Sequence, residues 1–335
     1  MIKKVGTYTR RFEKPPEILG YASVAGKKEW EGPLQASFDK VIYDAHAGMD
    51  SWEKAESLFQ QEALSIAIQK SKCNAEDINL IFAGDLLNQC ISSAYGLRDF
   101  NIPYLGQYGA CSTMAQSLLL ASLTVAAQWA EIAACVTSSH FCSAERQYRF
   151  PLEYGGQRPP TSQWTVTGSG SCILGYGEGQ KPKVRAGTFG RIIDLGVTDI
   201  NNMGAAMAPA AVMTLKNFLE DTKTSPDNYD KIYTGDLGST GSDLFCQLLA
   251  KEGIFLSNHE DCGLMIFDIN KSDVHSGGSG CGCSASVLCG RILNEVQAGN
   301  QKNILFIATG ALMSPISIQQ GESIPSIAHL INIVN

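Results

Sequence analysis

Residues 108–114 read Tyr-Gly-Ala-Cys-Ser-Thr-Met and place Cys111 in a tight turn directly before a long apolar segment. Gly109 and the small residues Ala110 and Ser112 allow the backbone to bend sharply at this point. A thiol at a helix start lies at the positive end of the helix dipole, which favours the thiolate and lowers the pKa. The pattern is typical of an activated nucleophile, with a buried structural thiol as the alternative.

Strands and helices are predicted to alternate on both sides of this turn. Their assignment rests on 3.6-residue apolar spacing for helices and on short apolar runs closed by turn residues for strands. Predicted strands cover 78–83, 132–137, 171–176, 184–193, 231–234 and 303–309, and predicted helices cover 51–72, 92–100, 113–129, 208–221, 242–251 and 284–298. The alternation predicts α/β layers with mainly parallel strands.

Two features recur at half-chain spacing. A strand ends in Gly84–Asp85 and another ends in Gly235–Asp236. A Gly/Ser/Cys turn opens an apolar helix at 109–112 and again at 277–284. The recurrence predicts two similar halves packed together.

Composition excludes several classes of function. The 335 residues are 44% hydrophobic and 18% charged, so a large core is available. A net charge of −7 disfavours a nucleic-acid partner, because phosphate contacts need a basic face. The most apolar stretch, 114–134, is interrupted by Gln116, Gln128 and Glu131, and the N-terminus turns polar after Met-Ile-Lys-Lys. We therefore expect no spanning helix, no signal peptide and synthesis on the cytoplasmic side, with peripheral membrane association left open.

The cysteines do not predict a metal site. There are 11 of them, scattered, and none forms a C-x-x-C pair; Cys281 and Cys283 form only C-x-C. The spacing predicts reduced, mostly buried thiols in a reducing compartment. We expect neither a metal nor a cofactor.

Several of these features resemble the thiolase superfamily, in particular its ketoacyl synthase III-like branch. They are the Gly84–Asp85 strand end, the turn at 109–112 with its helix, the Gly/Ser-rich turn at 277–284 and the closing strand 304–312. The resemblance implies a thiolase-like five-layered α/β/α/β/α sandwich of two pseudo-repeated halves. The halves are expected at 1–180, which carries Cys111, and at 181–335.

More narrowly, three stretches resemble the stage V sporulation AD family of spore-forming Firmicutes. They read Tyr-Gly-Gly-Gln-Arg-Pro-Pro-Thr at 154–161, Thr-Val-Thr-Gly-Ser-Gly at 165–170 and Gly-Gly-Ser-Gly-Cys-Gly-Cys-Ser-Ala at 277–285. This resemblance implies a protein that binds dipicolinic acid and takes part in its transport into the developing spore. It also implies a peripheral place at the spore inner membrane beside other proteins of the same operon. The thiolase-like resemblance implies a homodimer.

Condensing enzymes of the superfamily need more than the cysteine. A His and an Asn, or two His, from the second half stabilise the enolate oxygen that develops on the thioester. In this sequence Asp236 follows the strand end that should offer a His, and 276–283 contains no Asn. Cys111 is therefore expected to be a vestigial or uncertain nucleophile in a degenerate scaffold, and condensation by the usual mechanism is not expected.

The ligand-binding candidates are strand-end and turn residues expected around one central cavity: Asp85, Asn88, Cys111, Ser112, His140, Asp236, His275, Gly278 and Cys281. For Asp85 and His140 the alternative is an ordinary turn or loop residue. Three arginines, Arg146, Arg149 and Arg158, are further candidates to receive carboxylates, although a surface loop explains each of them equally well.

Three functions remain open from the sequence. The first is a binder of dipicolinic acid, in which Cys111 stays a neutral thiol because a thiolate would repel a dianion. The second is an acyltransferase that uses Cys111 with His140 or His275 as its base. The third is a non-binding structural subunit of a spore membrane complex.

Overall fold

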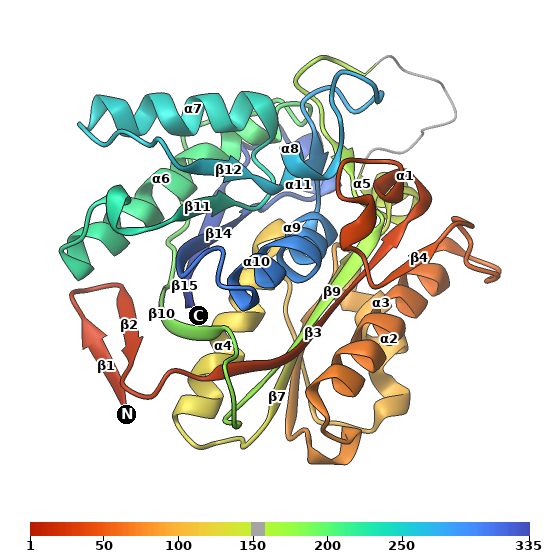
Figure 1. Ribbon diagram of the computed structural model, residues 1–335. Coiled ribbons are helices and arrows are strands. Elements are labelled where there is room, and N and C mark those ends of the chain that lie inside the picture. The colour runs from red at the N-terminus through yellow and green to blue at the C-terminus, as the bar shows by residue number, and fades with distance from the viewer. Residues whose placement is uncertain (149–157) are drawn as a thin grey trace.

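The fold is that of a layered α/β protein, seen in a computed structural model that describes residues 1–148 and 158–335 (Figure 1). Its helices are α1 (Lys27–Trp30), α2 (Trp52–Ser71), α3 (Ile91–Leu97), α4 (Thr113–Ala126), α5 (Phe141–Tyr148), α6 (Met203–Thr222), α7 (Gly238–Lys251), α8 (Cys262–Ile266), α9 (Cys281–Val287), α10 (Leu293–Gln297) and α11 (Pro315–Gln319). Its strands are β1 (Ile2–Val5), β2 (Thr9–Phe12), β3 (Glu17–Gly26), β4 (Lys40–Ile42), β5 (Leu80–Gly84), β6 (Tyr104–Gly106), β7 (Ala133–Ser139), β8 (Trp164–Thr165), β9 (Gly168–Gly175), β10 (Lys183–Thr188), β11 (Lys231–Thr234), β12 (His259–Asp261), β13 (Gly278–Ser279), β14 (Asn303–Ala311) and β15 (Ser326–Val334).

Two strand arrangements of the same order form the main path of the sheet, and β1, β2 and β4 are attached to it. The first runs β6-β5-β7-β9-β3 and the second runs β12-β11-β14-β15-β10. In each, the second strand is parallel to both neighbours, and the fourth strand is antiparallel to both of its neighbours. The two arrangements touch where Glu17 of β3 pairs with Lys183 of β10. The repeat predicted from the two Gly-Asp strand ends is thus present in the topology.

The prediction of mainly parallel strands was wrong. β15 had no predicted counterpart, and it lies antiparallel between β14 and β10. Antiparallel neighbours need no helical crossover, so the short connection 312–325 is sufficient to bring the chain back beside β14. The antiparallel β9 and β3 take the same place in the first half.

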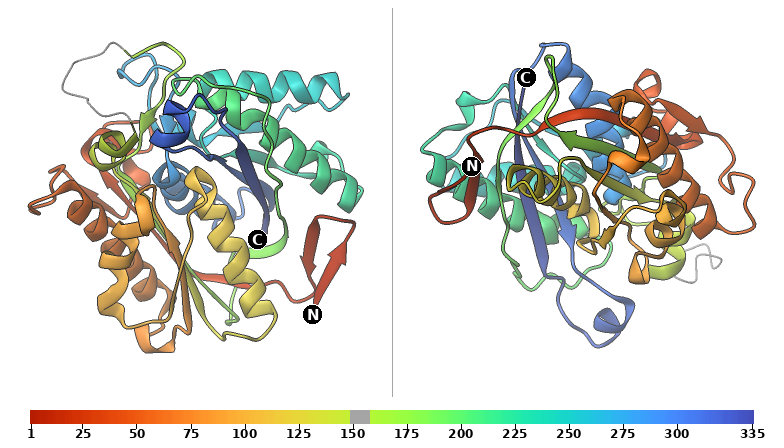
Figure 2. Two further views of the ribbon diagram at one scale, coloured as in Figure 1. Left: turned by 180° about the vertical axis from the view of Figure 1, so that it is seen from behind. Right: turned by 90° about the horizontal axis from the view of Figure 1, so that it is seen from below.

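Helices cover both faces of each arrangement, and Figures 1 and 2 show the resulting layers. α2 packs against β3, β9 and β7 on one outer side, and α6 packs against β15 and β14 on the other. α4 lies between the halves, in contact with β5 and β7 of the first and with β14 and β15 of the second; α9 contacts β7 and β9 beside it. The five-layered α/β/α/β/α sandwich expected from the resemblance is confirmed.

The helix predictions were close in position and less good in extent. α2 begins after Ser51, whose Oγ accepts the N–H of Lys54 at 3.3 Å, and it ends at Lys72 in the left-handed conformation. The single helix predicted at 284–298 is α9, a π-helical turn (Leu288–Ile292) and α10 in succession. A wide turn of this kind inside a helix is a common local adjustment, and apolar spacing does not predict it.

The central helix α4 carries the core. Met114, Leu118 and Leu119 are fully buried in it between the two halves. Burying one such side chain contributes roughly 1.5–3 kcal/mol relative to leaving it exposed. The packing of α4 therefore fixes the position of the turn that precedes it, which carries Cys111.

Candidate functional site

A cavity of about 440 Å³ lies beside Cys111. It is bounded by the turn before α4, by α5, by the β8–β13 pair and by the segment that leads from β14 into α11. Its described lining is Leu86, Tyr108, Ala110, Cys111, Ala144, Glu145, Tyr148, Thr165, Met203, Ser279, Gly280, Ala311, Leu312, Met313, Ser314 and Ser317. Both halves contribute, so the cavity exists only when the two halves pack.

The turn that presents Cys111 is held firmly. Ala110 has a positive φ of 49°, a left-handed conformation that costs energy for any residue with a Cβ. The Ser112 hydroxyl donates to Gly109 O at 2.6 Å and the Thr113 hydroxyl donates to Ala110 O at 2.6 Å. Gly310 of β14 passes so close that a Cβ there would lie 2.5 Å from Gly109 O. The sharp bend predicted from small residues is present, and β14 supports it from the second half.

The side chain behind the Cys111 thiol is Asp236, which follows β11. It is fully buried and accepts four hydrogen bonds. The Cys111 thiol donates one of them; the others come from Ser279 Oγ (3.1 Å), Gly280 N (2.9 Å) and Thr309 Oγ1 (3.0 Å). This carboxylate therefore connects the Cys111 turn to β13 and β14 of the second half.

The thiol is neutral for two physical reasons. Burial, and next the negative charge of Asp236, raise the pKa of Cys111 well above its ordinary value. The helix dipole predicted to lower that pKa is outweighed, so the expectation of a thiolate at the helix start was wrong. The neutral thiol expected for a binder agrees with this geometry.

Asp85 does not reach the cavity. Its two oxygens accept from Leu87 N (2.9 Å) and from the N–H and hydroxyl of Ser93 (2.8 and 2.6 Å). Burial raises its pKa, and nearby Glu56, bonded by Ser138 and Ser143, has a pKa raised by burial to about 8. Asp85 braces a turn in its own half and is not among the lining residues.

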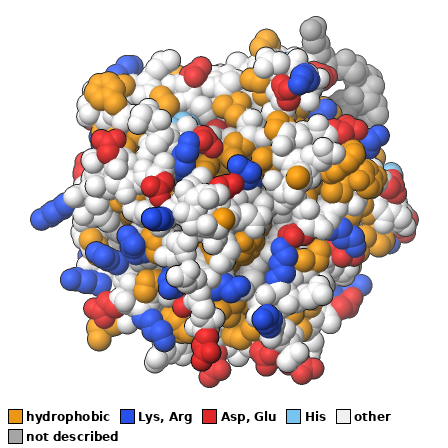
Figure 3. Space-filling view, viewed as in Figure 1, with side chains coloured by type: hydrophobic (Ala, Val, Ile, Leu, Met, Phe, Trp, Pro, Cys, Tyr) orange, Lys and Arg blue, Asp and Glu red, His pale blue; other side chains and the backbone are white. Residues whose placement is uncertain are grey.

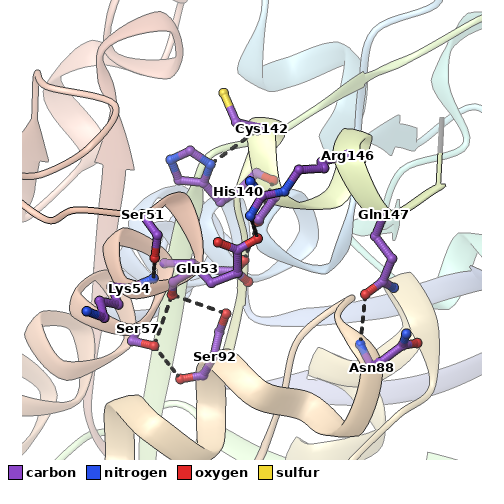
Figure 4. Close-up of polar contacts among 12 residues, drawn as sticks. Ser51, Glu53, Lys54, Ser57, Asn88, Ser92, His140, Cys142, Arg146 and Gln147 are labelled. Atoms are coloured by element: carbon purple, nitrogen blue, oxygen red, sulfur yellow. Dashed lines mark hydrogen bonds and ion pairs between the residues drawn. The ribbon is translucent and has the colours of Figure 1, made fainter. Parts of the chain in front are cut away.

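Asn88 stands behind the cavity wall rather than in it. Its Oδ1 accepts from the hydroxyl of Tyr108 at 3.2 Å, and its backbone N–H donates to Gln147 Oε1 at 3.0 Å (Figure 4). Tyr108 and Tyr148 line the cavity with their hydroxyls 3.2 Å apart. Asn88 thus positions Tyr108, which the sequence interpretation did not select.

Neither histidine candidate faces Cys111. His140 is buried, with Nε2 2.8 Å from Ala45 O and Nδ1 accepting the Cys142 N–H at 3.2 Å (Figure 4). Burial lowers its pKa. His275 faces Asp273 at 3.2 Å, and neither histidine lines the cavity. The structure therefore does not bring the predicted bases to the thiol, because the His140 ring is held by Ala45 and Cys142 and the His275 ring faces Asp273.

The remaining candidates lie next to the lining. The Ser112 hydroxyl donates to Gly109 O within the turn and is not directed to the cavity. Gly278 precedes the lining residue Ser279 in β13. The Cys281 thiol donates to Ser138 O at 2.9 Å, and burial raises its pKa well above the ordinary value. Of the nine predicted ligand-binding residues, Cys111 alone is among the described lining residues.

The sequence did contain signals for some of the missed residues. Tyr108 lies three positions before Cys111, in the stretch that decided the fold. Glu145 and Tyr148 are three positions apart on α5 and so share one helical face. Glu145 is buried, and its Oε1 accepts from the Thr165 hydroxyl at 3.1 Å. Ser314 and Ser317 cap α11 mutually at the opposite wall.

Neither of the two described arginine candidates, Arg146 and Arg158, lines the cavity. Arg146 pairs with Glu53 on the outside of α5 and lies over the Trp52 ring, as Figure 4 shows for the ion pair. Arg158 donates to Gln163 O. Arg149 lies outside the described residues. The described lining holds one carboxylate, Glu145, and no basic side chain.

The thiols and the possible metal ligands complete the site. All eleven cysteines are free, and eight of them are buried. Among residues 1–148 and 158–335, no three His, Cys, Asp or Glu side chains are grouped so that they could hold a metal ion. The helices in these ranges include none with the length and apolarity needed to cross a membrane.

Comparison with known proteins gives two kinds of similarity. The family described as stage V sporulation protein AD matches residues 6–334. A curated relative, stage V sporulation protein AD of Bacillus subtilis strain 168, is 42% identical over 329 residues, which cover 98% of this chain and 97% of the relative.

Solved structures share the fold at low sequence identity. The 3-oxoacyl-acyl-carrier-protein synthase III of Aquifex aeolicus VF5 aligns with a TM-score of 0.58 and 11% identity, covering 96% of this chain and all of that one. A variant of OleA from Xanthomonas campestris aligns with a TM-score of 0.60 and 12% identity, covering 97% and 100%. Another OleA variant, solved with lauric acid and lauroyl-CoA, also reaches 0.60.

Proposed function

The chain belongs to the stage V sporulation protein AD family, and from this membership we propose that it binds dipicolinic acid and serves dipicolinate uptake into the developing spore. Family membership supports the role in sporulation. The observation that carries the binding proposal is the cavity beside Cys111, whose thiol is kept neutral by burial and by the charge of Asp236. A site built this way recognises a ligand without attacking it.

The lining suits a flat ring with carboxylates. Tyr108 and Tyr148 offer aromatic faces and hydroxyls, and four further hydroxyls come from Thr165, Ser279, Ser314 and Ser317. Hydrogen bonds from such donors to a charged acceptor contribute about 1.5–3 kcal/mol each. Tyr108 is the best placed, because its bond to Asn88 is long at 3.2 Å and is readily exchanged for a carboxylate oxygen.

Glu145 limits how a dianion can sit. Its buried carboxylate already accepts the Thr165 hydroxyl at 3.1 Å and offers the ligand no hydrogen-bond donor. We therefore place the carboxylates of the ligand at the tyrosine and serine walls, with the ring edge toward Glu145.

Calorimetric titration with dipicolinate tests the proposal. Wild-type protein is expected to bind with measurable heat and a raised melting temperature. Tyr108→Phe is expected to bind about tenfold more weakly, as the loss of one charged hydrogen bond predicts. Tyr43→Phe, a half-exposed tyrosine outside the lining, is the matched control and is expected to bind normally.

Absence of both heat and thermal shift at millimolar dipicolinate would contradict the proposal. That result would favour the third function, a structural subunit of a spore membrane complex. Equal binding by Tyr108→Phe and wild-type protein would support dipicolinate as the ligand but contradict the role of Tyr108 as a donor to its carboxylate.

One observation favours acyl transfer as a second candidate. Cys111 opens onto a cavity with a large apolar share, contributed by Leu86, Ala144, Met203, Leu312 and Met313. Incubation with an acyl-CoA followed by intact-protein mass spectrometry separates the two functions. A stoichiometric adduct that Cys111→Ser abolishes would establish acyl transfer, whereas an unmodified mass is expected for a binder.

We also propose a homodimer, peripheral at the spore inner membrane with other proteins of the same operon. The edge strand β6 supports the dimer, since its three residues are exposed and Leu105 is 48% accessible. An apolar, unpaired edge strand favours pairing with another chain. Sedimentation of wild-type protein and of Leu105→Lys tests this, with a monomer expected for the variant.

A further inference from the structure

The N-terminal hairpin concentrates positive charge in an acidic protein. Residues 1–14 contain Lys3, Lys4, Arg10, Arg11 and Lys14 against a single acidic residue, while the whole chain carries a net charge of −7. Screening limits an exposed charge to about 10 Å at ordinary ionic strength. A partner that approaches this corner therefore meets the local cations rather than the net charge.

The register of the hairpin sets like charges against each other. β1 and β2 pair antiparallel, with Lys3 opposite Arg11 and Lys4 opposite Arg10. Like charges directly opposite one another destabilise a strand pair. Successive side chains point to opposite faces, so each face of the ribbon carries one such pair. The arrangement costs stability in the free protein, and an anionic partner would offset that cost.

The neighbouring strand extends the same charge. β2 pairs with β10, where Ala186 lies opposite Arg11. Burial, and next the positive charge of Arg11, lower the pKa of Arg185. Among the described residues, Lys3, Lys4, Arg11 and Arg185 form no ion pair. Cations of other elements do, for example Lys54 of α2 with Asp50 and Lys231 of β11 with Glu260.

The hairpin is nevertheless mounted rigidly. Asp221, at the end of α6, accepts the backbone N–H groups of residues 7, 8 and 9, each at 2.8 Å. Thr9 and Thr188 share a hydroxyl hydrogen bond of 2.7 Å, and Phe12 is buried. Figures 1 and 2 show the hairpin as a projecting corner, and Figure 3 shows Lys and Arg side chains gathered over it.

We propose that this hairpin docks the protein on a membrane surface rich in anionic phospholipid headgroups. A projecting ribbon with cations on both faces can press into a field of phosphates without shape complementarity. An acidic protein face would instead require a matching surface around the hairpin. Lys and Arg near an anionic leaflet attract it additively, so several cations at one corner suffice for reversible binding.

The proposal goes beyond dipicolinate binding and does not depend on it. None of the hairpin residues lines the cavity. It deepens the proposed peripheral location by naming the face that meets the lipid.

Cosedimentation with vesicles tests the proposal. Wild-type protein is mixed with two kinds of vesicle. One is pure phosphatidylcholine, and the other contains roughly 40% of the anionic lipid phosphatidylglycerol. The hairpin variant is Lys3→Gln/Lys4→Gln/Arg11→Gln, which leaves the half-buried Arg10 in place. The matched control, Lys72→Gln/Lys251→Gln/Lys302→Gln, removes the same charge from exposed lysines elsewhere.

Wild-type protein and the control are expected to bind the anionic vesicles and to leave them in high salt. The hairpin variant is expected to bind at least tenfold more weakly, with an unchanged or higher melting temperature and normal dipicolinate titration. Equal binding by the two variants, or no wild-type binding to anionic vesicles, would overturn the proposal. The latter result together with binding of an acidic protein would assign the hairpin to a protein partner.

Discussion

The ends of β5 and β11 are the same in sequence and opposite in use. Each strand closes with Gly-Asp, as Gly84–Asp85 and Gly235–Asp236, and each carboxyl is buried with a raised pKa. The oxygens of Asp85 bond only the turn at 87–93 of its own half. Those of Asp236 bond β13, β14 and the Cys111 turn.

The difference teaches that the repeat preserves the position of the carboxyl and not its partners. In the first half the turn after β5 folds back and satisfies Asp85 locally. In the second half Asp261 bonds the corresponding turn through Leu237 N (2.9 Å) and Gly238 N (3.0 Å). Asp236 therefore faces the centre, where its charge, together with burial, raises the pKa of Cys111 and keeps the thiol protonated.

The largest expected effect is that of Asp236→Ala. Four donors lose their acceptor in a buried place, and we expect a loss of about 4 kcal/mol in the free energy of unfolding, measured by urea denaturation. The pKa of Cys111 is expected to fall toward its ordinary value, since the charge of Asp236 helps to raise it. The pH profile of alkylation measures that fall. An alkylation profile identical to wild type would contradict the role of Asp236.

Asp85→Ala should cost less and leave the thiol alone. Its three donors lie on one turn, which can shift toward the exposed Asn88 and so toward solvent. Removal of the Asp85 charge also removes a repulsion that, after burial, raises the pKa of Glu56. We expect a loss of about 2 kcal/mol. Alkylation of Cys111 is expected to keep the wild-type profile. A shift comparable with that of Asp236→Ala would erase the distinction between the two strand ends.

The pH dependence of stability separates the same two regions. Burial raises the pKa of Glu56 from 4.5 to about 8 in the first half and that of Asp261 from 3.8 to about 7 in the second. Both groups stay protonated in the folded protein and ionise in the unfolded chain, so their contribution is complete below pH 4. It is lost progressively as the pH rises from the ordinary pKa of each group to its folded value of about 8 for Glu56 and about 7 for Asp261.

Urea midpoints at pH 5, 6, 7 and 8 measure this loss, which is at most about 1.4 kcal/mol per pH unit for each group. Glu56→Gln is expected to flatten the profile up to pH 8, and Asp261→Asn only up to pH 7. Stability that rises over this range in the wild-type protein would show that neither carboxyl is held protonated.

The smallest expected effect is that of a substitution in the two turns that line the cavity. Ala110 has φ 49° and Gly280 has φ 99° at corresponding turns before α4 and α9. Ala110→Gly removes left-handed strain and adds backbone freedom to the unfolded chain, so a change below about 1 kcal/mol is expected. The reverse change, Gly280→Ala, places a Cβ 2.7 Å from Ser139 Oγ and serves as the unfavourable control.

Much of the fold followed from local pattern. The apolar spacing in α2 and α4 and the short buried runs of β5, β7, β11 and β14 were placed within a few residues. β15 escaped because a strand buried on both faces shows no alternation, and nothing local marks its antiparallel neighbours. The family resemblance rested on the order of turns, which local sequence does record.

The candidate site was predictable only in part. Cys111 and Asp236 were selected because each lies in a recognisable local pattern, a tight turn for Cys111 and a Gly-Asp strand end for Asp236. Tyr108, Glu145 and Thr165 come from three separate segments, and each is unremarkable where it stands. His140 was selected for its residue type, yet its ring nitrogens are taken by Ala45 and Cys142.

The sequence by itself determined the recurrence of the two Gly-Asp strand ends and the Cys111 turn. Only the tertiary structure decided which Gly-Asp end faces Cys111, that the thiol is neutral and which side chains line the cavity. The physical reason is that periodicity and turn chemistry act over a few residues. The pKa of a buried thiol and the shape of a cavity depend instead on groups brought together from distant parts of the chain.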